Sequence, residues 1–304
     1  MLTINRKDLI IIPELPEVEN VRMSLEKKII GKTIVDTQVF AEKISDKALI
    51  KMLRKQDMNQ FIQNTIGCTF LTAERRAKFL MTKVEKNGES FYIVVHLAMA
   101  GKWLTAEKLE DLSALNQKHI IVQFTLSDGS YLVYSDHRRF GAISIHKEME
   151  YLAMESIHGL GPEPFWDNAD EIFLRNIKKK KFEDKAIKGE IMNQGVVAGI
   201  GNIYACEAIH VLGIHPEEKV KDLTDNELKD IFHVAKETMA FSITVGGSSV
   251  NDYVNGEGMM GSFQNYLKVY GRSICDCGTA IQQIEVAGRT THFCPKCQIL
   301  KSNK

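Results

Sequence analysis

The sequence predicts an α+β protein in which an N-terminal helix and an antiparallel β-sandwich precede a helical second half and a C-terminal cysteine cluster. Three observations predict this class. An apolar stripe with helical spacing opens the chain, short segments with two-residue alternation follow, and helical patterns with start and stop signals fill most of the second half. Strands and helices segregated along a chain are typical of α+β architecture. The length of 304 residues suggests two domains.

The first expected element is a helix over residues 14–31. Its apolar face consists of Val18, Val21, Leu25 and Ile29. Pro16 lies near the start, where a missing N–H is tolerated, and Gly31 can end the helix. The segment leading into it, Pro13-Glu-Leu-Pro-Glu-Val-Glu19, is rich in acids, which favour the positive end of a helix dipole.

Short strands are expected next. Alternating segments cover residues 91–96, 119–124 and 131–135. The turn Ser127-Asp-Gly-Ser130 joins the last two as a hairpin. We therefore expect an antiparallel sandwich that ends near residue 150.

Glycines interrupt the first helices of the second half. A short helix over 187–193 is followed by the glycine-containing break 195–201 and by a second helix over about 202–212. The free N–H groups at Asn202 could form an anion site. A simple turn between two helices explains the same residues.

A longer helix is expected to start at Thr224. Thr224 and Glu227 form a capping box, and Leu223 with Leu228 can form a hydrophobic staple. The helix ends before a glycine-rich loop, roughly residues 246–262, which leads to the cysteine cluster.

The formal net charge is zero, so any affinity for nucleic acid must come from local clusters of positive charge. The candidates are Arg75–Arg76–Lys78, Arg138–Arg139 and Lys178 to Lys181. For a charge run taken alone, a solvated face is the better explanation. No apolar run is long enough for a membrane span and no signal peptide is evident, so we expect a soluble cytoplasmic protein without membrane contacts.

Four cysteines near the C-terminus have the layout of a zinc site. They are Cys275, Cys277, Cys294 and Cys297. Four thiolates suit tetrahedral Zn²⁺, and an ion with all positions filled by protein is structural. The one-residue gap of the first pair places both side chains on one face but too far apart for one ion unless the backbone bends. Four unrelated thiols are the alternative. Between the pairs we expect a hairpin over 281–291 with Arg289 at its tip, which suits a backbone phosphate.

The segment Asp136-His-Arg-Arg-Phe140-Gly141 places two guanidinium groups beside an aromatic ring. In a protein that binds duplex DNA, Phe can wedge between bases while Arg holds a phosphate or an orphaned base edge. A surface turn with Phe140 in the core is the alternative. Met99, taken alone, is expected to be a core residue.

Taken together and in order, these motifs resemble the formamidopyrimidine-DNA glycosylase and endonuclease VIII family. The matching elements are Pro13-Glu-Leu-Pro-Glu-Val-Glu19, Arg75-Arg-Ala-Lys78, His96-Leu-Ala-Met99, Arg138-Arg-Phe-Gly141, Leu160-Gly-Pro-Glu-Pro164, Ala198-Gly-Ile-Gly-Asn-Ile-Tyr204, Gly271-Arg272 and the cysteine finger. They span residues 13 to about 298, and their collinearity makes the resemblance specific.

The resemblance implies a fold and a division into domains. The fold is an N-terminal helix plus β-sandwich, then a helix–two-turn–helix domain with a C-terminal zinc-finger hairpin. The expected segments are an extension over 1–12, a catalytic sandwich domain over 13–150, a DNA-binding domain over 151–262 and a zinc finger over 263–304.

The resemblance also implies roles for single residues. Pro13 is the nucleophile, Glu14 the acid beside it and Lys78 a catalytic lysine that binds phosphate. Three residues fill the gap left by the everted base, namely Met99, Arg138 and Phe140, with Arg139 beside them in the DNA-binding set. The remaining roles are a lysine near the lesion pocket, two phosphate clamps and a supporting carboxylate, held by Lys188, Asn202, Arg289 and Glu207.

The implied activity is excision of oxidised purines, formamidopyrimidines and 8-oxoguanine, followed by strand cleavage at the abasic site. The target base must leave the stack to be reached. A secondary amine at a chain terminus can attack C1′ and form an iminium ion, after which β- and δ-elimination release the strand ends. The resemblance implies one structural Zn²⁺ and no organic cofactor. It further implies a monomer that binds damaged double-stranded DNA in a bacterial, nucleoid-associated setting.

One feature departs from the family pattern at the mechanistic centre. Twelve residues precede Pro13, and an internal proline nitrogen is a tertiary amide that cannot attack C1′. We favour translation from codon 12, where Ile12 stands at the place of the initiator Met, so that its removal leaves Pro13 as the mature terminus. The alternatives are that the extension is cleaved off, that the protein binds lesions without catalysis, or that Lys78 serves as the nucleophile instead. Asn251 stands where many relatives carry Arg, which bears on lesion preference.

Three other functions compete with this interpretation. An endonuclease VIII-like enzyme would prefer oxidised pyrimidines. A non-catalytic protein that binds damaged DNA would keep the clamp residues without a free amine. A plain zinc-finger nucleic-acid protein would leave Glu14, Lys78 and the Arg-Arg-Phe segment unexplained.

Overall fold

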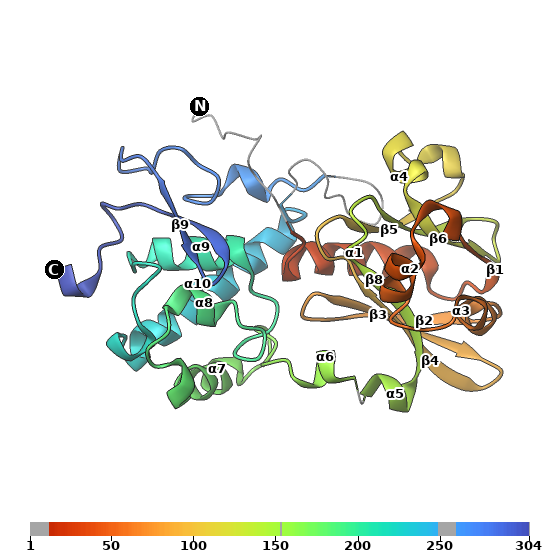
Figure 1. Ribbon diagram of the computed structural model, residues 1–304, viewed down its shortest axis with the longest axis horizontal. Helices are drawn as coiled ribbons and strands as arrows, with labels where there is room; N and C mark the ends of the chain where they lie inside the picture. The colour runs from red at the N-terminus through yellow and green to blue at the C-terminus, as the bar shows by residue number, and fades with distance from the viewer. Residues whose placement is uncertain (1–11, 153, 249–259, 304) are drawn as a thin grey trace. The chain divides into compact units, whose positions relative to one another are not determined.

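The structure is a computed structural model that describes residues 12–152, 154–248 and 260–303, and its chain folds into two compact units (Figure 1). The sandwich unit contains residues 16–158 and 251–261. The helical unit contains residues 1–15, 159–250 and 262–304. The chain therefore passes from one unit to the other between Leu15 and Pro16 and again between His158 and Gly159.

The sandwich unit contains two four-stranded antiparallel sheets, with strand orders β1-β6-β7-β5 and β2-β3-β4-β8. The strands are β1 (Ile34–Val39), β2 (Thr69–Arg76), β3 (Phe79–Lys86), β4 (Glu89–His96), β5 (Gly101–Ala106), β6 (Ile120–Leu126), β7 (Tyr131–Asp136) and β8 (Ala142–Lys147). The helices are α1 (Leu15–Ile29), whose first residue belongs to the helical unit, and α2 (Asp46–Met52), α3 (Met58–Thr65), α4 (Ala114–Lys118), α5 (Glu148–Leu152) and α6 (Glu155–His158). The α+β class is confirmed.

The predicted apolar face of the first helix is buried in the sandwich core. Val18, Val21, Leu25 and Ile29 are each at most 1 % exposed. They pack in one cluster with strand residues such as Phe70 and Phe124. Two of the predicted strands lie within β4 and β7, and the third, 119–124, begins one residue before β6. The predicted turn joins β6 to β7, which pair in antiparallel register.

The helical unit has its own hydrophobic core, which is contributed mainly by its longer helices. Its helices are α7 (Ala169–Ile177), α8 (Ile187–Ile191), α9 (Asn202–Val211) and α10 (Asp225–Thr244). The Thr224–Glu227 capping box at the start of α10 is present, with Glu227 N–H donating to Thr224 Oγ1 over 3.2 Å. Leu223 and Leu228 are both buried, as a hydrophobic staple requires.

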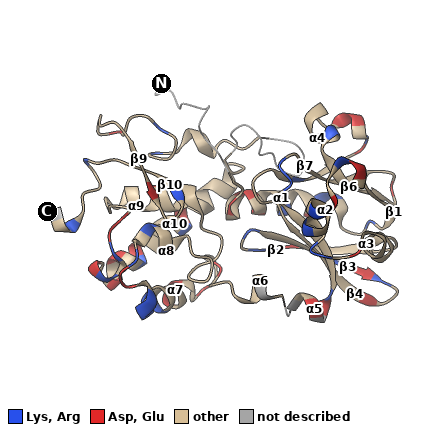
Figure 2. Ribbon diagram, viewed as in Figure 1, with Lys and Arg blue, Asp and Glu red and all other residues tan. Residues whose placement is uncertain are grey.

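A two-stranded hairpin of β9 (Gln282–Val286) and β10 (Arg289–Phe293) lies between the two cysteine pairs. The lysine run after α7 belongs to a surface where Lys and Arg are interspersed with Asp and Glu (Figure 2). Lys178 pairs with Asp225 at 2.6 Å, for example, which favours the solvated-face interpretation of that run. Among the described residues, no helix is both long enough and apolar enough to cross a bilayer.

Candidate active site and metal centre

The Glu14 carboxylate closes the N-terminus of α9. Its Oε2 accepts a hydrogen bond from Gly201 N–H at 2.8 Å, and its Oε1 accepts one from Ile203 N–H at 2.9 Å. The side chain is 2 % exposed. A carboxylate at this position satisfies amides that have no partner within the helix and lies at the positive end of its dipole. At the start of α9, where an anion site was predicted, a carboxylate of the same chain therefore occupies two of the amides.

A fully buried lysine lies in the same unit. Lys188 is 0 % exposed and donates from Nζ to Oδ1 of Asn202. Burial lowers the pKa of Lys188, the Glu14 carboxylate opposes this change, and the Arg289 guanidinium adds to it. The structure thus brings together four of the predicted site residues, namely Glu14, Lys188, Asn202 and Arg289. Pro13, which is itself buried, precedes Glu14 in the chain.

Asn202 also fastens α9 to the hairpin. Its side-chain amide donates to the carbonyl of Thr290 at 2.8 Å, beside Arg289 in β10. Arg289 itself is exposed. The Asn202 amide therefore joins the buried lysine to the strand that begins with this exposed cation.

Glu207, one and a half turns further along α9, organises the chain that leads to the cysteines. Its two carboxylate oxygens accept hydrogen bonds from Lys268, Val269 and Tyr270 N–H at 2.8 to 3.0 Å. Burial raises the pKa of Glu207, while these three N–H donors act in the opposite direction. The carboxylate therefore holds the backbone of residues 268–270 against α9.

The glycine-containing break before α9 is held by one side chain. Gln194 accepts from Gly199 N–H at 2.8 Å and donates to the carbonyl of Ile200 at 2.8 Å. Gly199 has a φ of +87°, and a Cβ there would lie 2.4 Å from Cδ1 of Leu15. Only glycine fits this close approach. Leu15 N–H donates to the Gly199 carbonyl, so the break also fixes the segment that carries Glu14.

In the sandwich unit, three turns that carry predicted residues lie at one end of the sheets. Lys78 is in the β2–β3 turn, Met99 in the β4–β5 turn, and Arg138 with Phe140 in the β7–β8 turn. Strand register brings the flanking residues together, since Phe79 pairs with His96, His96 with Ala142, and Gly101 with Asp136. Phe140 is 51 % exposed and Met99 is half-buried outside the core clusters, so the core interpretations of both residues are wrong.

Asp136 holds the β7–β8 turn in shape. This carboxylate is 1 % exposed and accepts from the N–H groups of Arg138, Arg139 and Gly141 at 2.9 to 3.0 Å. Arg139 adopts a φ of 59° and donates to the carbonyl of Lys43. The Arg138 guanidinium lies 5.8 Å from the centre of the Phe140 ring. The turn therefore presents an exposed cation and an exposed aromatic ring from a pre-organised backbone.

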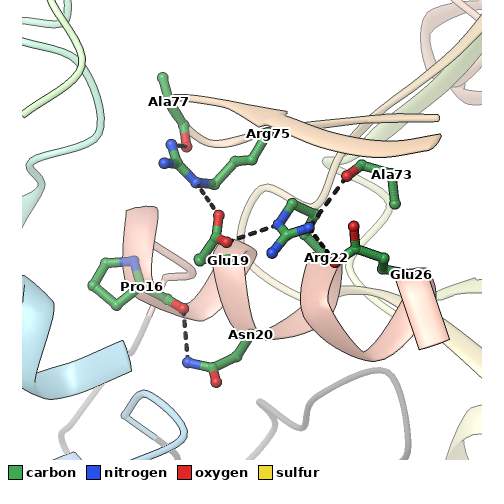
Figure 3. A network of polar contacts seen from close by, with 8 residues as sticks. All are labelled: Pro16, Glu19, Asn20, Arg22, Glu26, Ala73, Arg75 and Ala77. Atoms are coloured by element: carbon green, nitrogen blue, oxygen red, sulfur yellow. Dashed lines mark hydrogen bonds and ion pairs between the residues drawn. The ribbon is translucent and has the colours of Figure 1, made fainter. Parts of the chain in front are cut away.

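A partly buried ion-pair network supports the turn that carries Lys78 (Figure 3). Arg75 Nε donates to Glu19 Oε2 at 2.8 Å, and Arg75 Nη1 donates to the carbonyl of Ala77 at 3.0 Å. Glu19 also accepts from Arg22 of the same helix at 2.7 Å. The Arg75 side chain is only 9 % exposed. Arg75 therefore braces the turn, and the predicted basic cluster does not expose all three of its cations.

The four C-terminal cysteines form one group. Their sulfur atoms all lie within 4.8 Å of one another, with Cys275–Cys297 at 3.9 Å and Cys277–Cys294 at 3.6 Å. A tetrahedral Zn²⁺ with Zn–S bonds of about 2.3 Å has sulfur–sulfur edges of about 3.8 Å. The group therefore fits one zinc ion. The chain turns at Asp276 and Cys277, which supplies the bend that the one-residue gap requires.

The sequence did not reveal the positioning roles of three residues: Glu19, which holds Arg75, Gln194, which holds the break before α9, and Asp136, which holds the β7–β8 turn. Short polar motifs cannot reveal which backbone groups a side chain will reach across the fold. Asn251 and most of the extension before Pro13 lie outside the described residues.

Comparison with known proteins finds three matching family models. They are the formamidopyrimidine-DNA glycosylase N-terminal domain over residues 12–143, its H2TH domain over 160–254, and a zinc finger found in FPG and IleRS over 276–299. A formamidopyrimidine-DNA glycosylase of Bacillus cereus is 37 % identical over 290 residues, which cover 94 % of this chain and 99 % of that protein.

Solved structures agree with these models. A variant of Lactococcus lactis FPG in complex with DNA containing Fapy-dG matches with a TM-score of 0.81 at 33 % identity, covering 94 % of this chain and all of that one. The wild-type Lactococcus lactis protein in complex with DNA containing an oxidised pyrimidine matches with a TM-score of 0.80 at 33 % identity, with the same coverage.

Proposed function

Because the chain belongs to the formamidopyrimidine-DNA glycosylase family, we propose that it excises oxidised purines, formamidopyrimidines and 8-oxoguanine, and cleaves the strand at the resulting abasic site. The protein is a DNA glycosylase of base excision repair. The observation that carries the proposal is the position of the Glu14 carboxylate, buried on the amides of α9 beside Lys188 and directly after Pro13.

The proposed reaction begins at the nitrogen of Pro13. As a chain-terminal secondary amine it attacks C1′ of the everted nucleotide, the C1′–N-glycosidic electron pair leaves with the base, and the sugar ring opens to an iminium ion. Elimination of the 3′ and then the 5′ phosphate follows, and water releases the amine. An α-amino group has a pKa of about 7.7–8.0 in model compounds, so a useful fraction is neutral near pH 7.

Glu14 is the proposed proton carrier for these steps. It protonates the ring oxygen as the sugar opens and takes up a proton during elimination. Its hydrogen bonds to Gly201 and Ile203 fix its position, and Lys188 lies close enough to interact with it electrostatically.

The remaining predicted residues have proposed roles in binding DNA. Lys78, Asn202 and Arg289 bind phosphates, and Lys188 lies near the lesion. The exposed side chains of Arg138 and Phe140, with Met99, fill the space that the everted base leaves, and Arg139 contributes to DNA binding. Glu207 supports the chain into the finger, where Cys275, Cys277, Cys294 and Cys297 hold one structural zinc that orders the β9–β10 hairpin.

This chemistry requires a free amine at Pro13, and we propose that the mature protein begins there. Two observations support this start: a proline amide has no nucleophilic lone pair, and the family match begins at residue 12. We further propose the four-segment domain division given above, a monomeric state and association with the nucleoid.

Borohydride trapping tests the proposal. Protein beginning at Pro13 is expected to form a covalent adduct with a duplex containing 8-oxoguanine, whereas protein beginning at Met1 and kept intact forms none. Glu14→Gln in the Pro13 protein is expected to lower the single-turnover excision rate by about 10²–10⁴-fold, because the proton carrier is lost.

Mass spectrometry of the peptide joined to DNA identifies the amine. An adduct on Lys78, or an adduct formed by protein with an intact Met1 terminus, would refute the role of Pro13. A matched panel with oxidised-pyrimidine duplexes separates the endonuclease VIII-like alternative, which gains weight from the Lactococcus lactis complex with such DNA. Tight binding without any adduct from the Pro13 protein would indicate a damage-binding protein instead.

A further inference from the structure

His210, on the last turn of α9, contacts the cysteine group from a different element. Its Nε2 lies 3.4 Å from Sγ of Cys275, within hydrogen-bond range for sulfur. Its Nδ1 is buried and has no hydrogen-bond partner among the described residues. A neutral imidazole carries one proton, and only the tautomer with the proton on Nε2 forms an N–H···S contact.

The sulfur that His210 contacts is the buried one of the shortened pair. Cys275 is 3 % exposed, whereas its partner Cys277 is exposed and can be hydrated. Four thiolates around one Zn²⁺ leave a net charge of about −2, which N–H···S hydrogen bonds stabilise. A buried thiolate cannot obtain this stabilisation from water.

His210 also follows Glu207 by three residues, so both side chains leave the same face of α9. Glu207 binds the backbone of residues 268–270, and His210 binds Cys275 five residues later. The two contacts hold consecutive parts of the same segment against one helix.

We propose that His210 is a positioning residue of the zinc centre, which donates from Nε2 to the Cys275 thiolate and so compensates for the shortened Cys275–Cys277 pair. It is not itself a ligand, because the group of mutually close ligand atoms contains the four cysteines alone among the described residues.

Zinc affinity in competition with a chromophoric chelator tests this proposal in the full-length protein. His210→Phe keeps a planar ring and removes the donor, and it is expected to weaken zinc binding about 10–100-fold. His210→Gln places an amide N–H near the original Nε2 and is expected to retain most of the affinity. His233→Phe, on the exposed side of α10, is the matched control and should bind zinc like the parent.

Cobalt substitution gives a second measurement that reports the ligand set. The thiolate-to-Co²⁺ charge-transfer and d–d bands of His210→Phe are expected to keep the parent positions, since the four sulfur ligands remain. Three results would overturn the proposal: parental zinc affinity in His210→Phe, equal loss in His210→Phe and His210→Gln, or a band shift showing that an imidazole ligand has been lost. If His210→Phe does not fold, His210→Leu serves in the same comparison.

Discussion

His96 shows how a single buried side chain links the fold to pH. The imidazole ends β4 and packs on the ring of Phe79 at 4.8 Å between centres. Burial lowers the pKa of His96 to about 4, and the positive charges of Arg54 and Lys78 act in the same direction. The unfolded chain therefore binds a proton between about pH 6.5 and 4 that the folded protein does not.

This difference predicts that His96 makes the unfolding free energy of the protein fall in acid. A folded-state pKa below the unfolded value means that stability is lost as pH falls below 6.5, until the folded pKa near 4 is reached. The difference between the two pKa values corresponds to at most about 3.4 kcal/mol. His96→Gln is expected to make the decline in unfolding free energy shallower over this window. Denaturant unfolding at pH 7 and pH 4.5 measures it, and parallel declines in parent and variant would contradict the assignment.

At the scale of elements, the turns of the sandwich depend on side chains that cap backbone groups from outside the strands. Asp136 accepts three N–H groups of the β7–β8 turn. Gly141, which ends this turn, has no room for a Cβ, because a Cβ there would lie 2.6 Å from the carbonyl oxygen of His96. The turn that bears Arg138 and Phe140 is therefore shaped before any DNA arrives.

Replacing this carboxylate tests the pre-organisation of the turn. Asp136→Ala leaves three N–H groups near the protein interior without their acceptor, and we expect a loss of roughly 1–3 kcal/mol in unfolding free energy. Affinity for an abasic-site duplex should fall as well, because the exposed cation and ring are no longer held. Arg138→Ala is the comparison, with weaker DNA binding at unchanged stability. Equal DNA affinity of Asp136→Ala and the parent would exclude the pre-organising role.

The same elements show how far sequence reasoning reaches. Long periodic signals and caps predicted α1 and α10 well, because Val18 to Ile29 repeat at helical spacing and Thr224 with Glu227 form a local capping box. The helices α2 and α3 were not predicted, since seven and eight residues give too little periodicity. Glu14, Lys188 and Asn202 were named from family resemblance. Their mutual contacts depend on tertiary packing, which no local pattern encodes.

At the scale of the whole molecule, two separate hydrophobic cores indicate that the units can respond separately to perturbation. Each unit contains one tryptophan. Trp103 is buried in the sandwich core, whereas Trp166 is 47 % exposed in the helical unit. The chain therefore carries one fluorescent reporter for each unit.

Zinc removal is expected to affect the helical unit first. A chelator should abolish binding to lesion DNA, because the hairpin that bears Arg289 loses its metal support. In a Trp166→Phe variant, where Trp103 alone reports, the midpoint of thermal unfolding should stay within about 2 °C of the zinc-loaded value. Restored DNA binding after zinc is added back serves as the control. A large drop in the Trp103 midpoint would show that the two cores unfold as one.

The contact between Gly199 and Leu15 limits how this protein can diverge. A side chain at position 199 meets the leucine at 2.4 Å and also faces an unfavourable φ of +87°. Shortening Leu15 to alanine would still leave its Cβ 2.7 Å from a Cβ at position 199 and would leave the backbone strain untouched, so this change is not expected to rescue a substitution there. Both the steric contact with Leu15 and the positive φ oppose any other residue at position 199. A saturation library at this codon should therefore recover few functional variants.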